Sequence, residues 1–205
     1  MKMLSWIPVG LMLVAVGCAA KSKEESGGLK IGDVMPKRDV EMKNVDEQML
    51  TLGEIAGEKG TLVIFSCKHC PFVQAWQDRM VKIGNDAVDK GIGVVFINSN
   101  DPAEYPTDDL ENMQQQAIEA GYEFPYVVDA TSDVARAFGA GRTPEVFLFD
   151  ANMKLVYHGA IDDNTYKPEE VKKHYLRDAV DALLAGEEIP VQETKSVGCS
   201  IKYRD

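Results

Sequence analysis

Short continuous runs of apolar residues alternate along this chain with stretches in which apolar residues recur at helical spacing. Four-residue runs such as 94–97 are typical of strands that are covered on both faces. Strands are therefore predicted at 62–65, 94–97, 125–128, 145–150 and 154–157, with short strand-like pieces between 31 and 52. Helices are predicted from the cysteine pair at 67 and 70 to about 89, and at 107–120, 132–138 and 168–184. The last two strands should form an antiparallel pair around 151–152. This alternation predicts an α/β domain with a mixed central β-sheet flanked by helices on both faces.

The first residues have the pattern of a secretory signal. Lys2 is followed by the apolar stretch 4–16, which is too short for an ordinary membrane span, although a short transmembrane anchor is the alternative. Residues 14–18, Val-Ala-Val-Gly-Cys, resemble the bacterial lipoprotein signal, with Ala15 where that family usually has Leu. The resemblance implies that Cys18 carries lipid and attaches the mature chain to a membrane, on the periplasmic or extracytoplasmic face of the bacterial cell envelope.

These features divide the chain into four parts. We expect a signal peptide at 1–17, a lipidated cysteine with a flexible tether at 18–28, a single domain at 29–186 and a C-terminal tail at 187–205. The chain is 45% hydrophobic, which is enough for one core, and its formal net charge of −11 speaks against nucleic-acid binding.

Cysteine usage adds a constraint. Of the four cysteines, Cys18 would be used by lipid, which leaves Cys67, Cys70 and Cys199. An odd number of cysteines outside the cytoplasm predicts a free or mobile thiol.

The most informative motif is Cys67-Lys68-His69-Cys70-Pro71, between the strand predicted at 62–65 and the next helix. One helical turn would hold both sulfurs close enough to bond, at a helix start where free N–H groups and the helix dipole favour a thiolate and where Pro71 is tolerated. This pattern favours thiol–disulfide exchange. Half of a zinc site and an inert structural disulfide are the alternatives, but no second CxxC completes the four ligands of zinc, and so short a loop gains little from closure.

Within the motif, Cys67 is expected to attack a substrate disulfide, because the cysteine nearer the helix start should be the more exposed and the better stabilised as a thiolate. Cys70 would resolve the mixed disulfide from one turn away. Positive charge on Lys68 and His69 would favour the thiolate, although His69 also fits a solvent-facing position. No cofactor or metal is expected, and the expected partners are protein or small-molecule thiols and disulfides.

A strand, the CxxC helix and a later Thr143-Pro144 before an apolar strand resemble, in this order, the thioredoxin superfamily. More narrowly, the chain resembles the redoxin branch that includes alkyl hydroperoxide reductase and thiol-specific antioxidant proteins, over about residues 30–185. The resemblance implies a thioredoxin-like fold and a cis peptide bond before Pro144, which places this loop against the CxxC sulfurs. An ordinary strand-entry turn at Thr143-Pro144 is the alternative.

The chain departs from the thioredoxin pattern at two points. The Trp-x-x-Trp-Cys approach is absent, because Phe65-Ser66 runs straight into Cys67, and the strand at 62–65 carries no buried acid. Proton handling during exchange is therefore unassigned. Glu145, directly after Pro144, either stands near the sulfurs and moves protons or is an exposed carboxylate at a strand end.

Two other functions fit the same fold. In the peroxiredoxin pattern, a Thr stands three residues before a peroxidatic cysteine that is followed by Pro. Cys70-Pro71 matches the last two positions of this pattern, and Arg142 lies about where that family carries an arginine. Two positions differ, because Cys67 replaces the Thr and Val63 replaces the Pro expected upstream. Such a peroxidase needs an electropositive pocket for the leaving oxygen. Copper-delivery proteins of this fold bind metal through two cysteines and a distant His, for which His158 is the candidate, although they space their cysteines one residue further apart.

The tail from residue 191 mixes apolar and aromatic residues and is expected to pack on the domain. Its ending, Gly198-Cys199-Ser200-Ile201-Lys202-Tyr203, resembles the Gly-Cys-Ser-Ile-Lys-Trp close of a bacterial subgroup of redoxin-like proteins that carries the CxHCP site. If the tail folds back over the CxxC helix, Cys199 becomes a second resolving thiol that receives the disulfide from Cys67 or Cys70. The alternative is an unreactive buried cysteine that anchors the tail.

Overall fold

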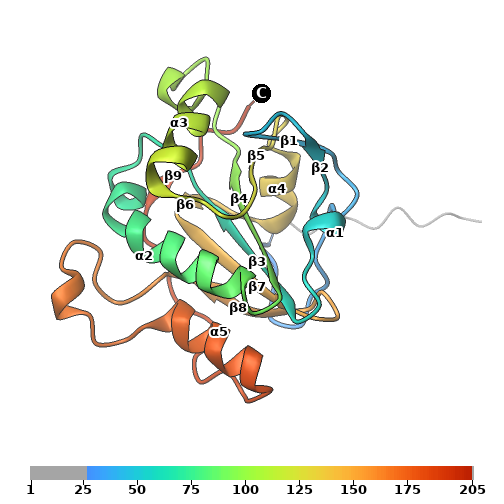
Figure 1. The fold of residues 1–205 in the computed structure, drawn as a ribbon, viewed down its shortest axis with the longest axis vertical. Helices are drawn as coiled ribbons and strands as arrows, with labels where there is room; N and C mark the ends of the chain where they lie inside the picture. The colour runs from blue at the N-terminus through green and yellow to red at the C-terminus, as the bar shows by residue number, and fades with distance from the viewer. Residues whose placement is uncertain (1–26, 205) are drawn as a thin grey trace, which may run out of the picture.

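The structure is a computed structural model that describes residues 27–204. Its centre is a sheet with the strand order β2-β1-β5-β4 on one side and β3-β7-β8 on the other, and β3 lies beside β4 (Figure 1). The strands are β1 (Met42–Asn44), β2 (Met49–Leu50), β3 (Gly60–Phe65), β4 (Ile92–Asn98), β5 (Tyr126–Val128), β7 (Glu145–Asp150) and β8 (Leu155–Gly159), and a separate short pair is formed by β6 (Arg142–Thr143) and β9 (Cys199–Ser200). The predicted signal peptide, Cys18 and the tether up to residue 26 lie outside the described residues.

Hydrogen bonds at the strand ends give the direction of the central pair. The N–H of Lys59 donates to the carbonyl of Gly91, and the N–H of Ser66 donates to the carbonyl of Ile97. Because both residue numbers rise together, β3 and β4 are parallel, as β4 and β5 are. β3 pairs antiparallel with β7, and β7 and β8 form the predicted hairpin. The mixed sheet is therefore confirmed.

Helices cover both faces of this sheet. They are α1 (Leu52–Ile55), α2 (Pro71–Val88), α3 (Leu110–Ala120), α4 (Asp133–Phe138) and α5 (Tyr175–Ala185), with two 3-10 turns, η1 (Pro106–Asp108) and η2 (Pro168–Glu170). Alternate side chains of β3 enter different cores: Leu62 and Ile64 pack with α2, α3 and α5, whereas Val63 and Phe65 pack with α1 and α4. The predicted covering of both faces is confirmed.

Two predicted helices are interrupted. The helix predicted at 107–120 restarts as α3, because the side chain of Asp109 accepts the N–H of Asn112 and caps the helix there. The continuous helix predicted at 168–184 is wrong, since η2 and α5 are separated by residues 171–174. The carboxylate of Asp163 accepts hydrogen bonds from the N–H groups of Lys172 and Lys173. In a continuous helix, these N–H groups would bond to backbone carbonyls of the preceding turn.

The loop between β8 and α5 is fixed to α2 by a buried carboxylate. Asp162, which is 5% exposed, accepts the indole N–H of Trp76 at 2.8 Å and forms an ion pair with Arg79. Arg79 also donates to the carbonyls of Asn164 and Thr165 in the same loop. The helix that follows the CxxC motif is thereby joined to its neighbouring loop.

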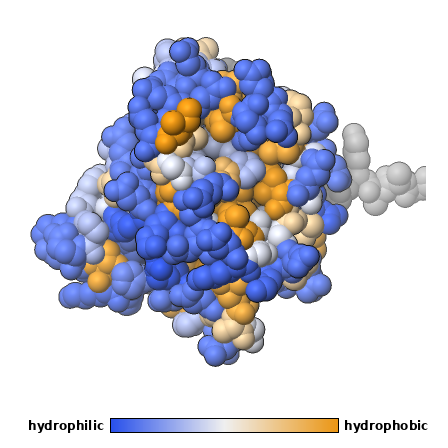
Figure 2. Space-filling view, viewed as in Figure 1, coloured by the Kyte–Doolittle hydropathy of each residue, from blue (hydrophilic) through white to orange (hydrophobic). Residues whose placement is uncertain are grey.

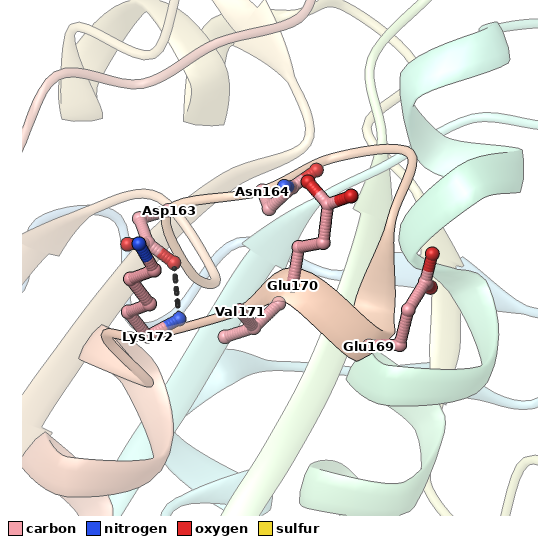
Figure 3. A pocket seen from close by; sticks show the side chains of 6 residues that line it. All are labelled: Asp163, Asn164, Glu169, Glu170, Val171 and Lys172. Carbon is pink, nitrogen blue, oxygen red and sulfur yellow. Dashed lines mark hydrogen bonds between the residues drawn. The ribbon is translucent and has the colours of Figure 1, made fainter.

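This loop also borders a hollow of about 560 Å³ (Figure 3). Its lining residues are Asp163, Asn164, Glu169, Glu170, Val171 and Lys172. Figure 3 shows the carboxylate of Asp163 bonded to the backbone of Lys172, so this acid is already used to hold the loop. None of the lining residues is a cysteine, and the hollow is separate from the thiol motif.

The surface of the domain is largely polar. The face in Figure 2 is mostly hydrophilic, and its apolar side chains form small separate groups. Within residues 27–204, no helix combines the length and the apolar character that a membrane span requires.

Asp162→Ala should lower the free energy of unfolding by about 3–5 kcal/mol, because it leaves the partly buried Arg79 charge and the Trp76 N–H without their partner. Urea unfolding followed by tryptophan fluorescence gives this value. The matched control is Asp86→Ala, whose ion pair with Lys82 lies at the surface and should contribute at most about 1 kcal/mol. Equal losses in the two variants would contradict the structural role of Asp162.

Candidate functional site

Three cysteines from two distant parts of the chain meet beyond the end of β3. Cys67 and Cys70 lie in the connection between β3 and α2, and Cys199 lies in β9 of the tail. The sulfur atoms of Cys70 and Cys199 are 2.7 Å apart, and all three residues are free thiols in this structure. Cys67 and Cys70 are 0% exposed, whereas Cys199 is partly exposed. The tail therefore folds back onto the CxxC segment.

The helix starts later than the motif predicts. α2 begins at Pro71, with Cys70 as its N-cap in an extended conformation, and Cys67 stands outside the helix. The residue before a proline is driven out of helical conformation, so the helix cannot continue backwards through Cys70. The prediction of both cysteines in one helical turn is therefore wrong, and so is the expectation that Cys67 is the more exposed and the better stabilised of the two. Pro71 occupies the first turn as predicted.

Thr143 contacts both sulfurs of the motif. The peptide bond between Thr143 and Pro144 is cis, as the resemblance implied. The hydroxyl oxygen of Thr143 is 3.2 Å from the sulfur of Cys67, and the thiol of Cys70 donates to the Thr143 carbonyl at 3.1 Å. The prediction that this loop lies against the CxxC sulfurs is confirmed.

The three thiols influence one another's ionisation. The pKa of Cys70 is lowered, and the largest cause is its interaction with the Cys67 thiol. Burial acts in the opposite direction. The Cys199 thiol and the N–H groups of Val73 and Cys199 lower this pKa further. The same interaction with Cys70, then burial, then the charge of Asp108 raise the pKa of Cys67. Burial, followed by the proximity of Cys70, raises the pKa of Cys199. The first negative charge of the cluster therefore resides on Cys70, at the helix N-terminus.

A buried carboxylate that the sequence analysis missed holds the segment between the two cysteines. Asp108, the last residue of η1, is 2% exposed. Its Oδ1 accepts the N–H groups of Lys68 and His69 at 2.8 and 3.1 Å, and its Oδ2 lies 2.5 Å from Nδ1 of His69. These bonds fix the loop that separates the sulfurs.

The sequence held one signal for this acid. The polar run 98–101 follows β4, and the carboxyl ends of neighbouring parallel strands meet at one edge of a sheet. Asn100 in this run is 1% exposed, and its side-chain amide donates to Oδ2 of Asp108 at 2.8 Å. The 3-10 turn that carries Asp108 has no comparable pattern in the sequence.

Lys68 and His69 make their hydrogen bonds with groups other than the sulfurs. The ammonium of Lys68 donates to the side-chain oxygens of Asn112 and Gln115 at 3.1 and 3.2 Å. The ring of His69 stacks on Tyr105 with centroids 4.3 Å apart, and its Nδ1 faces the carboxylate described above. The positive charges predicted to stabilise a thiolate are thus directed at other partners.

Glu145 is buried and takes neither of the two predicted positions. It is 6% exposed, and its Oε2 accepts the N–H groups of Gly141 and Arg142 at 2.8 and 2.9 Å. Its Oε1 lies 2.8 Å from Nε2 of His158. This carboxylate holds β6, the strand that ends at Thr143, and its bonds are made with these groups and not with a sulfur.

The residues that pointed to the two other functions are engaged elsewhere. The guanidinium of Arg142 donates to the carbonyl of Gly198 in the tail at 2.9 Å. The ring of His158 stacks on Phe147 with centroids 4.5 Å apart and pairs with Glu145. Neither side chain bonds a sulfur of the CxxC motif, whereas a peroxidase pocket would need Arg142 there and a copper site would need His158 there.

One group of three potential metal ligands occurs within residues 27–204, namely Cys67, His69 and Asp108, with donor atoms within 4.8 Å of one another. Both oxygens of the Asp108 carboxylate already accept hydrogen bonds, from Lys68, His69 and Asn100. A metal would have to displace the bonds that hold the loop, so the residues present fit thiol chemistry better than metal binding.

Asp108→Asn should lower the pKa of Cys67, because it removes a negative charge that opposes ionisation and keeps an oxygen for the two N–H groups. The measurement is a pH titration of thiolate absorbance in a background in which Cys67 is the only cysteine. The matched control is Asp109→Asn, which removes the same charge one residue away and retains a good N-cap for α3. Identical titration curves for the two variants would refute the influence of Asp108.

Comparisons with known proteins agree with this arrangement. The model of the AhpC/TSA family matches residues 31–158. Thiol-disulfide oxidoreductase ResA of Geobacillus thermodenitrificans is 25% identical over 169 residues, which cover 80% of this chain and 88% of that protein. The crystal structure of an uncharacterized conserved protein from Geobacillus kaustophilus has 40% sequence identity and a TM-score of 0.79, over 85% of this chain and 93% of that one.

The fold itself is shared more widely. A thioredoxin-like protein solved in its oxidized form is 21% identical, with a TM-score of 0.60, over 78% of this chain and 100% of that one. The chain has a thioredoxin-like fold and belongs to the AhpC/TSA family.

Proposed function

We propose that this protein is a thiol–disulfide oxidoreductase that exchanges disulfides through Cys67 and Cys70. The observation that carries the proposal is that the Cys70 sulfur, at the N-cap of α2, and the Cys67 sulfur both contact Thr143, at 3.1 and 3.2 Å. Such a pair can close a disulfide within the chain, and a thiolate at a helix N-terminus can attack one outside it. The name of the Geobacillus thermodenitrificans relative, thiol-disulfide oxidoreductase, supports the same chemistry.

Exchange proceeds in two balanced steps. One thiolate of the pair attacks a client disulfide, so that a mixed disulfide forms and a client thiolate leaves. The other thiolate attacks the mixed disulfide, so that the Cys67–Cys70 bond forms and the second client thiolate leaves. The pair loses two electrons and two protons, and the two client sulfurs gain them. The reverse sequence oxidises a client dithiol.

The electrostatics assign different parts to the two cysteines. The lowered pKa of Cys70 makes it the cysteine of the pair that loses a proton more readily and the better leaving group from a disulfide. Cys67 keeps its proton, and the Thr143 hydroxyl 3.2 Å away can exchange a hydrogen bond with it when that proton leaves. This reverses the order expected from the sequence, in which Cys67 reacts first.

A thiol peroxidase is the second candidate. It is favoured by the position of Cys70, which is the N-cap directly before Pro71, as the peroxiredoxin pattern requires of a peroxidatic cysteine. The position of Arg142 disfavours a peroxidase, because its guanidinium donates to the carbonyl of Gly198 in the tail and is not directed at a leaving oxygen on Cys70.

Replacing either Cys67 or Cys70 with Ser should abolish the catalytic reduction of insulin by dithiothreitol, because one remaining thiol of the pair cannot store two electrons as a disulfide. The rate of insulin precipitation measures turnover. Ser66→Ala is the matched control, since its buried hydroxyl lies in the same connection and has no hydrogen-bond partner among the described residues. Wild-type protein that consumes hydrogen peroxide catalytically and leaves insulin intact would replace this proposal with the peroxidase.

We also propose that lipid on Cys18 tethers the domain to a membrane outside the cytoplasm, on the strength of the leader and the tether in the sequence. Cys18→Ser should release the protein from the membrane fraction of bacterial cells or block removal of the leader. Cell fractionation and the intact mass of the purified protein report the two effects. A native mass without added lipid would contradict the anchor.

A further inference from the structure

The C-terminal tail forms part of the wall of the thiol site. β9 pairs antiparallel with β6 and places Cys199 opposite Thr143. At Gly198 a Cβ would lie 2.1 Å from the carbonyl oxygen of Thr143, so only glycine permits this approach. Arg142 donates to the Gly198 carbonyl from the other strand. The tail is therefore held against the strand that contacts both sulfurs of the CxxC motif.

Residues that follow Cys199 anchor the tail at a second point. The N–H of Lys202 donates to the side-chain oxygen of Asn100 at 2.8 Å, and the guanidinium of Arg204 donates to the Asn100 carbonyl. The side-chain amide of the same Asn100 donates to Asp108. One buried asparagine thus connects the tail to the carboxylate that holds the CxxC loop, and this fixes the third thiol relative to the other two.

Exposure differs among the three thiols. Cys67 and Cys70 are 0% exposed, and Cys199 is the partly exposed member of the cluster. With the tail in place, an external disulfide or thiol can therefore approach Cys199 before it approaches either cysteine of the motif.

We propose that Cys199 is a shuttle thiol, which transfers the disulfide between the buried Cys67–Cys70 pair and the client. This inference rests on the proposed function and names the residue that meets its substrate, a protein or small-molecule thiol or disulfide. In the oxidised protein, the Cys199 thiolate attacks the sulfur of Cys70. The Cys70–Cys199 bond forms, the Cys67–Cys70 bond breaks, and Cys67 leaves as a thiolate and takes up a proton.

The second half of the cycle involves the client. A client thiolate attacks the sulfur of Cys199, forms a mixed disulfide with it and releases the Cys70 thiolate. A second client thiolate then attacks the client's own sulfur in this mixed disulfide, which closes the client disulfide and frees Cys199. The client loses two electrons, and the Cys67–Cys70 pair has gained them. The same steps in reverse reduce a client disulfide.

Proximity selects the sulfur attacked in the first step, and leaving ability selects it in the client step. The sulfurs of Cys70 and Cys199 are 2.7 Å apart, so a small movement brings them to the disulfide bond length of about 2.05 Å. Cys70 contacts Cys199 directly and shares its neighbour Thr143 with Cys67, so its sulfur can exchange one partner for the other. A thiolate attacks preferentially the sulfur whose partner leaves more readily, and in a Cys70–Cys199 bond the partner that leaves readily is Cys70. Exposure and leaving ability thus both direct the client to Cys199.

The first test identifies the thiol that holds a client when Cys70 is absent. Full-length Cys70→Ser protein is incubated with oxidised glutathione, and peptide mass spectrometry locates the adduct, which is expected on Cys199. Adding Cys199→Ser to this variant should reduce the adduct by about tenfold or more, because the remaining Cys67 is buried. Ser200→Ala in the same background is the matched control on β9 and should leave the adduct unchanged. An adduct chiefly on Cys67 would overturn the shuttle.

The second test measures turnover in an otherwise intact site. Cys199→Ser should reduce insulin turnover by about tenfold or more, because an intramolecular transfer is lost, while the Cys67–Cys70 disulfide still forms on oxidation. Turnover equal to wild type would overturn the shuttle and leave the proposed function in place. Wild-type protein that neither reduces insulin nor forms the Cys67–Cys70 disulfide would overturn the proposed function itself, so the two failures are distinguishable.

Discussion

The thiol site depends on the hydrogen bonds of one buried carboxylate, that of Asp108. Through the N–H groups of Lys68 and His69 it holds the loop between the two motif cysteines, and through Asn100 it reaches the tail that carries Cys199. Three segments that are distant in sequence therefore share one set of bonds. A buried charge is costly unless its lone pairs are satisfied, and here each carboxylate oxygen has two hydrogen-bond partners.

The thioredoxin-like fold supplies the opposite wall of the site through β6. Glu145 binds the backbone at the start of this strand, Thr143 at its end contacts both sulfurs of the motif, and Gly198 allows β9 to lie directly against it. The backbone of the tail thus takes the edge of β6 that an extended client segment would otherwise pair with. The chain thus covers this edge itself, which is why the shuttle proposed above assigns the contact with a client to the tail.

Local patterns predicted the parts of this structure that local forces determine. The continuous apolar runs predicted β3, β4 and β7 correctly. The helical spacing of Val73, Trp76 and Met80 predicted α2, because a helix that is buried on one face repeats its apolar residues at that spacing. The start of α2 was misplaced because the effect of Pro71 on the preceding residue was not applied. Asp108 was missed because a short 3-10 turn has no period, and its function appears only when β3 and β4 are placed side by side.

The same distinction explains why the properties of the cysteines were less predictable than their identity. Cys67 and Cys70 lie against β6, and Cys70 also contacts Cys199 in β9, which pairs with residues more than fifty positions away; no local sequence pattern predicts such contacts. The contact with Cys199 also couples its ionisation to the redox state of the pair. While Cys70 is a thiolate, its proximity, second only to burial, raises the pKa of Cys199, whereas the charge of Lys202 lowers it. When Cys70 enters a disulfide with Cys67, that negative charge is lost and the influence of Lys202 is no longer opposed by it. In the proposed shuttle, this loss would make Cys199 more acidic when a disulfide is present for it to attack, and the charge on Cys70 would favour the protonated third thiol in the reduced protein.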